Sequence, residues 1–310
     1  MKAARIHKYG SPDVIVIDDI PRPDPGRGEV RVHVKAAGVA PWDALIRENK
    51  SVVPSPLPTI LGSDLSGVID AVGPEVSGFA IGDEVYGVTN PQFIGAYTEY
   101  AIASAGMIAP KPLSLSYIEA ASVPVVAVTA WQMLFEYGKA TEGQSVLILG
   151  GAGNVGAYAV QMAKSARLRI IATAGPNDVE YVRRLGADTV VDYRNARFED
   201  VAHDIDVVVD TVGGQTRDRA LNALRAGGIL VTVVSDSPPP EEAARARGVR
   251  TAFFLAEVTA SRLKALAGLF DNQILKPQVG SVLPLDQVRK AHEMLAGAPH
   301  ARGKIVLRVT

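Results

Sequence analysis

The chain has 310 residues, of which 47% are hydrophobic and 21% charged, with a formal net charge of -1 and no cysteine. Its length favours two domains, and its composition excludes a disordered chain. The missing cysteines exclude disulfides and thiolate chemistry, and the near-zero charge gives no reason to expect a nucleic-acid partner. No apolar run approaches the roughly 20 residues of a membrane helix, and MKAARIHKYG lacks a signal core. We therefore expect a cytoplasmic protein without a membrane partner.

The first part of the chain contains short β-patterns that proline and glycine interrupt. Strands are predicted over Glu29–Ala36, Gly67–Val72 and Glu84–Val88, as parts of a mostly antiparallel unit. In the first strand valines alternate with polar residues, which places His33 on the polar face as a solvated side chain. The five histidines have no metal-ligand spacing, so no metal site is predicted.

From about Ala120 onward, helical patterns alternate with short apolar runs. This alternation predicts a parallel sheet with right-handed crossovers. Its expected strands are Ser145–Leu149, Arg169–Thr173, Thr189–Val191, Asp206–Asp210 and Ile229–Val234, and the chain closes with helices over Ser261–Asp271 and Leu285–Leu295 and a strand over Lys304–Val309. The prolines at 238–240 interrupt the pattern near the carboxyl edge of the sheet, either as a loop that covers a ligand or as a solvated loop without a role.

A glycine-rich turn separates the strand Ser145–Leu149 from a helical pattern. It contains Gly150, Gly151, Gly153 and Gly156. Glycines let backbone N–H groups approach a pyrophosphate closely, and the helix N-terminus then faces its negative charge. Because a strand precedes the turn and a helix follows it, this GxGxxG pattern predicts a dinucleotide site rather than a merely structural turn.

Nearly the whole chain resembles one family, the zinc-independent quinone oxidoreductase (zeta-crystallin-like) branch of the medium-chain dehydrogenase/reductase superfamily. The similar segments are EVRVHVKAAGVAPWD, LPTILGSDLSGVIDAVG, GDEVYG, GAYTEYA, TAWQML, GQSVLILGGAGNVG, LGADTVVDY, DVVVDTVGG and GKIVL. The resemblance implies an α/β protein with a GroES-like β-domain, residues 1–118 and 275–310, and a Rossmann doubly wound parallel-sheet domain, residues 119–274. It also implies hydride transfer from NADPH to a small-molecule quinone or α,β-unsaturated carbonyl in the interdomain cleft, and a homodimer.

The same resemblance argues against zinc. Zinc-dependent relatives carry a cysteine in the segment that here covers residues 38–43, and a His-Glu pair where this chain has Ser63 and Asp64. Without thiolate or imidazole ligands these residues cannot hold zinc at useful affinity. We therefore expect no metal, and alcohol dehydrogenation is disfavoured because no metal would polarise the oxygen.

No catalytic residue can be named from the sequence. By family position the candidates in the substrate cleft are Trp42, Asp64, Tyr86 and Thr129, with solvent able to supply the proton. Trp42 is either a flat wall for a ring substrate or an interdomain packing residue. Asp64 is interpreted as an N-cap or interdomain hydrogen-bonding residue in preference to a catalytic acid.

The segment around residue 40 differs from the quinone-reductase pattern at one position and allows one local contact. Ala40 replaces the usual asparagine, so any hydrogen bond from that amide near the nicotinamide is lost. Asp43 and Arg47 stand four residues apart on a helical turn, and we expect an ion pair between them.

The dinucleotide is expected to be NADPH rather than NADH. NAD-specific domains carry an acid after the second strand, where this chain has Ala174. Tyr193 matches a family tyrosine at the adenosine phosphate, although the lysine of several relatives is missing around Pro176, Asn177 and Asp178. The full set of expected cofactor residues is Thr129, Gly150, Ala152, Gly153, Asn154, Val155, Thr173, Ala174, Tyr193, Val212 and Val234.

Two other functions stay open. A 2-enoyl-thioester reductase would need a basic entrance for a phosphopantetheine arm, and no such cluster is evident. A non-catalytic NADPH-binding protein, either crystallin-like or a sensor, would bind the cofactor without turnover.

Overall fold

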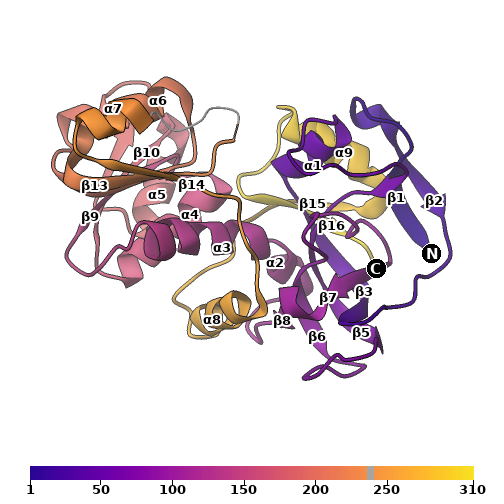
Figure 1. Cartoon of the computed structure of the whole chain (residues 1–310). Coiled ribbons are helices and arrows are strands. Elements are labelled where there is room, and N and C mark those ends of the chain that lie inside the picture. The colour runs from indigo at the N-terminus through magenta and orange to yellow at the C-terminus, as the bar shows by residue number, and fades with distance from the viewer. Residues whose placement is uncertain (236–240) are drawn as a thin grey trace. The chain divides into compact units, whose positions relative to one another are not determined.

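The structure, a computed structural model, describes residues 1–235 and 241–310 and divides into two compact units. The first unit contains Met1–Val125 and Val258–Thr310, and the second contains Val126–Glu257 (Figure 1). One division falls inside helix α3 (Pro124–Trp131). Residues 258–274, which the sequence assigns to the Rossmann domain, lie in the first unit, where Tyr86 donates a hydrogen bond to the Leu263 carbonyl. The prolines at 238–240 lie outside the described residues.

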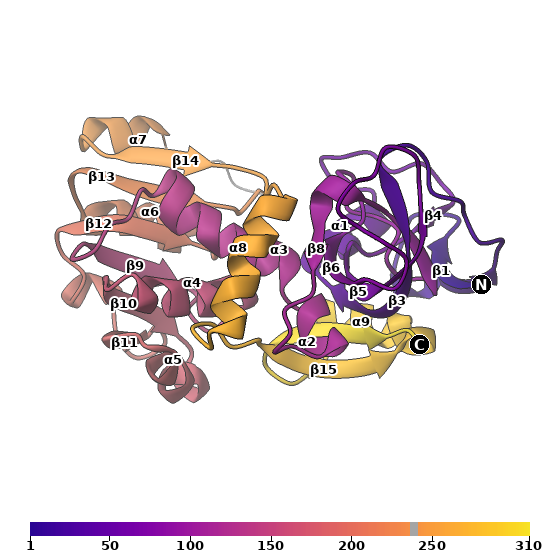
Figure 2. The same ribbon diagram turned by 90° about the horizontal axis from the view of Figure 1, so that it is seen from below.

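The second unit contains a parallel sheet of six strands in the order β11-β10-β9-β12-β13-β14 (Figure 2). Its strands are β9 (Ser145–Leu149), β10 (Arg169–Ala174), β11 (Thr189–Asp192), β12 (Ile205–Asp210), β13 (Leu224–Thr232) and β14 (Arg250–Phe253). The chain runs from β9 outward through β10 to β11, and then returns to the other side of β9 at β12. Strand order therefore reverses at β9, the position at which open α/β sheets bind ligands.

Helices connect these strands, as the alternating sequence pattern predicts. They are α4 (Asn154–Ser165), α5 (Val179–Leu185), α6 (Gly214–Ala220) and α7 (Glu241–Ala246), while α3 precedes the sheet. All five residues of β9 are buried, because helices of this architecture cover both faces of the sheet. Leu147, Leu149, Val208 and Leu230 from neighbouring strands share one apolar cluster.

The first unit contains a seven-stranded sheet and a three-stranded sheet. The larger one runs β15-β16-β3-β5-β6-β8, with β7 also paired to β3, and the smaller one runs β2-β1-β4. The strands are β1 (Lys2–Ile6), β2 (Ile15–Asp19), β3 (Glu29–Val39), β4 (Thr59–Ile60), β5 (Asp64–Val72), β6 (Glu84–Val88), β7 (Tyr100–Ser104), β8 (Ile108–Pro110), β15 (Val279–Pro284) and β16 (Lys304–Arg308), and the helices are α1 (Pro41–Arg47), α2 (Tyr117–Ala121), α8 (Ala260–Asp271) and α9 (Val288–Leu295). Except for β15 with β16, these pairings are antiparallel. The GroES-like and Rossmann architecture expected from the resemblance is confirmed.

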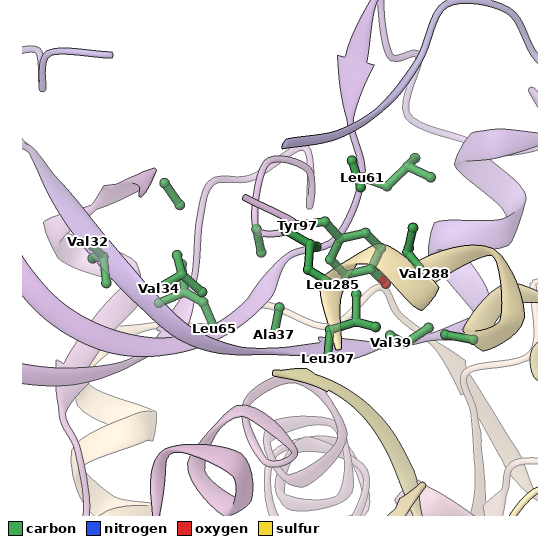
Figure 3. Packing of buried hydrophobic residues seen from close by; sticks show 14 of the residues in the cluster. Val32, Val34, Ala37, Val39, Leu61, Leu65, Tyr97, Leu285, Val288 and Leu307 are labelled. Carbon is green, nitrogen blue, oxygen red and sulfur yellow. The ribbon is translucent and has the colours of Figure 1, made fainter. Parts of the chain in front are cut away.

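The core of the first unit lies on the valine face of β3. Val32 and Val34 point into a cluster that also contains Leu65 and Leu307 (Figure 3). His33 lies on the opposite face, as the alternation predicts. Its ring is stacked on that of Tyr100 with the ring centroids 4.8 Å apart, so the side chain is half-buried rather than freely solvated. None of the described helices is long and apolar enough to cross a membrane.

Replacing Gly156 by alanine should destabilise the second unit. A Cβ atom there would lie 2.1 Å from the Gly150 carbonyl oxygen, so the backbone would have to move. We expect Gly156→Ala to lower the free energy of unfolding by at least about 2 kcal/mol, measured by urea denaturation. The matched control is Gly268→Ala in α8, where nothing lies within 4 Å of the new atom, and which should stabilise the helix by about 0.5–1 kcal/mol. Equal stability of the two variants would contradict the close approach.

Candidate functional site

The glycine turn at the end of β9 is built by backbone contacts. Gly150 has a φ of +81°, its N–H donates to Thr173 Oγ1 at 3.0 Å, and the Gly151 N–H donates to the Thr173 carbonyl at 2.8 Å. Helix α4 begins directly after Gly153, whose N–H donates to the Gly150 carbonyl. The turn therefore places the first N–H groups of a twelve-residue helix, which have no partner within the helix, at the carboxyl edge of the sheet.

The outer side of this turn is open. A Cβ atom on Gly153 would meet only the Gly150 oxygen at 3.3 Å, in contrast to the crowded position of Gly156. Gly153 is exposed, and Ala152, Asn154 and Val155 are only partly buried. The uncrowded position of Gly153 fits a pyrophosphate, whose charge the N–H groups at the start of the helix would bind.

The second strand of the sheet supports the turn and leads to the predicted adenosine side. Thr173 uses its hydroxyl as the acceptor for Gly150, so one role of this residue is to hold the glycine turn. Ala174 is buried and accepts the Tyr193 N–H through its carbonyl at 3.1 Å. Tyr193 is 59% exposed, and its hydroxyl lies 3.4 Å from where a Cβ atom on Gly175 would stand.

Asp178 lies close to the predicted adenosine side, which its place in the sequence does not show. The Asp178 Oδ2 atom is 3.9 Å from the same Cβ position on Gly175. Tyr193 and Asp178 therefore both border Gly175 beyond the end of β10. A 2′-phosphate bound there would meet one negative charge even though Ala174 carries none.

Asp210 organises the edge on the other side of β9, a role that sequence reasoning missed. This buried carboxylate accepts hydrogen bonds from the N–H groups of Val212 and Gly213 through Oδ1, and from the Thr232 hydroxyl through Oδ2. It thereby joins the ends of β12 and β13 and sets the loops that carry Val212 and Val234. The available signal was an acid directly after the apolar run Val207–Val209, because such an acid seldom stays buried without partners of this kind.

The cofactor residues predicted from the sequence thus gather at one edge of the second unit, with one exception. Gly150–Val155 follow β9, Thr173 and Ala174 end β10, and Tyr193, Val212 and Val234 follow β11, β12 and β13. Thr129 instead lies buried within α3. These positions could hold a dinucleotide, and its binding to each of them stays a prediction.

In the first unit, Trp42 lies within a compact polar cluster. Its Nε1–H donates to Ser63 Oγ at 3.3 Å, its ring meets Phe93 edge-on at 6.4 Å, and Lys304 Nζ lies 4.6 Å from the ring centre. Lys304 Nζ also donates to Asp64 Oδ2 at 2.8 Å. Burial raises the pKa of the Asp64 carboxyl, and the charge of Lys304 opposes this shift.

The residues at this place do not fit a zinc ion. Asp64 is engaged by Lys304 and also accepts the Val125 N–H at 3.1 Å, near the start of α3, which agrees with the interpretation of Asp64 as a helix-capping residue. Ser63 offers a hydroxyl rather than an imidazole. Among the described residues, no group of three or more histidine, aspartate or glutamate side chains could hold a metal ion.

The expected ion pair between Asp43 and Arg47 is wrong. Asp43 Oδ2 accepts the Ala40 N–H at 2.8 Å and the Tyr97 hydroxyl at 2.7 Å, while its Oδ1 has no hydrogen-bond partner. Arg47 donates to the Gly10 carbonyl and to His292 Nδ1, and pairs with Glu48. Asp43 caps the first turn of α1, and Arg47 is bound by the neighbouring Glu48 and by the distant residues Gly10 and His292 instead.

The buried cluster around Asp43 and Arg47 contains two groups with strongly shifted pKa values. Burial raises the pKa of Asp43 to about 7, although its hydrogen bonds from Tyr97 and Ala40 oppose the shift. Burial and the charge of Arg47 lower the pKa of His292 to about 3. Because Arg47 donates to Nδ1, the proton of the neutral imidazole is assigned to Nε2, which is buried without a hydrogen-bond partner.

Tyr86 and a surface pocket complete the description of the first unit. The buried Tyr86 hydroxyl donates to the Leu263 carbonyl at 2.7 Å, so its proton already has an acceptor within the fold. A pocket of about 550 Å³ is lined by residues of β1, β4 and β7 together with Pro56, Pro58 and Asn90, and it contains none of the predicted site residues.

A switch-point sheet with an open glycine turn in one unit and a GroES-like fold in the other define the class of two-domain Rossmann dehydrogenases and reductases. The family description "Alcohol dehydrogenase GroES-like domain" matches residues 26–113, and "Zinc-binding dehydrogenase" matches residues 185–307. The 2-methylene-furan-3-one reductase of Solanum lycopersicum is 34% identical over 319 residues, which cover 99% of this chain and 79% of that protein.

Solved structures give the same result. The quinone oxidoreductase from Coxiella burnetii superposes with a TM-score of 0.93 at 30% identity, covering 100% of this chain and 99% of that chain. The Escherichia coli quinone oxidoreductase, solved as a complex with NADPH, superposes with a TM-score of 0.89 at 25% identity, covering 99% and 100%. The chain belongs to the medium-chain dehydrogenase/reductase superfamily, among the relatives of quinone oxidoreductases and alkenal reductases.

Replacing Asp43 by asparagine should change how stability depends on pH. Between pH 3.8 and about 7 the folded chain holds a proton on Asp43 that the unfolded chain releases, so this group makes stability fall as pH rises. His292 acts in the opposite sense between about pH 3 and 6.5, because only the unfolded chain protonates it there. Asp43→Asn removes the contribution of Asp43. Between pH 3.8 and about 7, the free energy of unfolding of this variant minus that of the unsubstituted chain should therefore rise with pH by up to about 4 kcal/mol.

Urea denaturation at several pH values measures this slope. The matched control is Asp83→Asn, because the exposed Asp83 accepts the Ala80 N–H at 2.8 Å in the same way that Asp43 accepts the Ala40 N–H. The control should show no comparable slope. Parallel stability curves for Asp43→Asn and the unsubstituted chain would contradict the raised pKa.

Proposed function

We propose that this protein is an NADPH-dependent oxidoreductase that reduces a quinone or an α,β-unsaturated carbonyl without zinc. The open glycine turn at the switch point of the sheet carries the proposal, because it offers unpaired N–H groups to a pyrophosphate. The named activities of its relatives support the choice of acceptor: a 2-methylene-furan-3-one reductase, an alkenal/one oxidoreductase and quinone oxidoreductases.

In the proposed reaction NADPH, when bound, supplies a hydride to a carbon of the acceptor, and a proton from solvent completes the reduction. The N-terminus of α4 would bind the pyrophosphate, and Thr173 would keep the glycine turn in place. Trp42 would present an apolar face to the acceptor. Asp64 is not proposed as the proton donor, because its carboxyl is engaged by Lys304 and by the Val125 N–H.

NADPH is favoured over NADH by Ala174, where an acid would repel a 2′-phosphate. The complex of the Escherichia coli enzyme with NADPH and the name of the NADPH-dependent Arabidopsis thaliana relative support this choice. Asp178 acts against it, since its carboxylate borders the same region. The expected homodimer stays a prediction, to be checked by light scattering.

NADPH oxidation with phenanthrenequinone, followed by absorbance, tests the proposed function. We expect steady turnover that a zinc chelator does not reduce, and elemental analysis should find no stoichiometric zinc. Binding of NADPH without turnover of any quinone or enone would favour the non-catalytic alternative. Preference for an enoyl thioester over the free enone would favour the 2-enoyl-thioester reductase. About one zinc per chain, with activity lost on chelation, would overturn the metal-free mechanism.

Charge changes beyond the end of β10 should alter the preference between the two dinucleotides. Ala174→Asp should raise the dissociation constant of NADPH at least about tenfold more than that of NADH, because only NADPH carries a 2′-phosphate for the new carboxylate to repel. Asp178→Asn should strengthen NADPH binding and leave NADH binding nearly unchanged. Isothermal titration calorimetry of each variant with both dinucleotides measures this, with thermal unfolding as the control for folding. Equal effects on both dinucleotides would contradict this placement of the 2′-phosphate.

A further inference from the structure

A buried lysine lies against the indole ring of Trp42. Lys304 begins β16, which lies between β15 and β3 in the sheet of the first unit (Figure 1). Its side chain is 1% exposed, and its Nζ is 4.6 Å from the ring centre, within the range of a cation–π interaction. The same Nζ is 2.8 Å from Asp64 Oδ2, and Asp64 is fully buried. The fold therefore takes a complete ion pair out of water beside Trp42.

The surrounding positions are shaped to this pair. A Cβ atom on Gly38 would lie 2.5 Å from the Ala121 carbonyl oxygen, 2.9 Å from Asp64 Cβ and 3.0 Å from Lys304 Cε, so a larger residue there would clash with the backbone as well as with both side chains. Two residues along β16, and so on the same face, Val306 packs in an apolar cluster with Ala36 and Ala121. An apolar residue at position 304 would suit these surroundings, yet the chain places a charge there.

Stability does not account for this charge. The cost of removing two ions from water roughly cancels their attraction, and apolar replacements of buried ion pairs are often neutral or stabilising. The raised pKa of Asp64 reflects that cost, since burial outweighs the charge of Lys304. The reason for the pair is therefore to be sought in what the ammonium group touches.

Trp42 is the aromatic group that the ammonium touches, and its position is fixed by three contacts. Lys304 lies at the ring, Phe93 meets it edge-on, and the Ser63 hydroxyl accepts its Nε1–H. Residue Trp42 as a whole is only partly buried. A planar molecule that stacks on this indole would lie near the positive member of a buried ion pair.

We propose that Lys304 is a positioning residue that acts through Trp42, and that the acceptor is a planar cyclic quinone or enone rather than an open-chain alkenal. This inference rests on the proposed function. Hydride transfer to a conjugated ring spreads negative charge over the ring and its oxygens, and the proton from solvent neutralises it afterwards. The cation beside the indole stabilises that charge more than it stabilises the neutral acceptor, which accelerates the reaction. An open-chain alkenal has no ring to stack and gains less.

The test compares NADPH turnover with phenanthrenequinone and with 2-hexenal. The double variant Lys304→Met/Asp64→Asn replaces the ion pair by neutral side chains of similar size, and the asparagine oxygen can still accept the Val125 N–H. We expect its kcat to fall about tenfold more for the quinone than for the alkenal, with thermal unfolding and the dissociation constant of NADPH little changed. The single variant Lys304→Arg, which keeps the positive charge, should retain most of the selectivity that the double variant loses.

Two further variants make the outcome decisive. Trp42→Leu leaves the ion pair in place and should show the same selective loss, so the proposal remains testable if the double variant does not fold. Lys111→Met is the matched control, because Lys111 pairs with Glu84 and lies 5.5 Å from the Tyr117 ring elsewhere in the unit. This control should leave the ratio of the two activities unchanged.

Equal losses for both acceptors in the double variant and in Trp42→Leu would overturn the proposal and assign the pair a structural role. An unsubstituted enzyme that prefers the alkenal would overturn the substrate class. If the unsubstituted enzyme oxidises NADPH with neither acceptor, the proposed function itself fails and the inference fails with it.

Discussion

Helix α4 leaves the central strand of the second unit through a turn in which a Cβ atom on Gly156 would lie 2.1 Å from the Gly150 oxygen. Only glycine allows the helix to start this close to the strand. The approach directs the first turn of α4 at the carboxyl edge of the sheet, where its first N–H groups have no partner within the helix and no side-chain cap from Gly153. The partial positive charge of the helix N-terminus is thereby available to an anion, and the proposed chemistry depends on it.

The strands on both sides of β9 hold this turn in position. On one side Thr173 binds the N–H of Gly150 through its hydroxyl and the N–H of Gly151 through its carbonyl. On the other side the Thr211 hydroxyl donates to the carbonyl of Leu149, and Asp210 accepts hydrogen bonds from the loop that follows β12 and from Thr232 at the end of β13. A buried carboxylate with three donors is fully committed, so it rigidifies the edge. The phosphate-binding turn is thus one part of a connected edge.

Features that depend on residues close together in the sequence are predicted well, whereas features that depend on residues far apart in the sequence are not. The strand Ser145–Leu149 is predicted with its observed bounds, because apolar runs and glycine punctuation are local signals. The strand predicted over Gly67–Val72 in fact begins at Asp64, because its first residues include a buried aspartate and a buried serine, which do not have the apolar pattern of a strand. The Asp43–Arg47 pair fails because helical spacing cannot detect Tyr97 and His292, which lie 54 and 245 residues from their partners. The Lys304–Asp64 contact spans 240 residues and leaves no local signal.

The buried polar groups of the first unit meet near the junction of β3 and α1. Asp43 caps α1, while Lys304 contacts the Trp42 ring and pairs with Asp64 next to Gly38. Each buried charge costs free energy unless it is paired, so each one requires a partner at a defined position. Together these partners fix both the backbone and the indole at this junction, where an apolar core would leave Trp42 free to repack. The same desolvation that makes the cluster expensive also strengthens the field of the Lys304–Asp64 pair at the indole, because little water is present to screen the two charges.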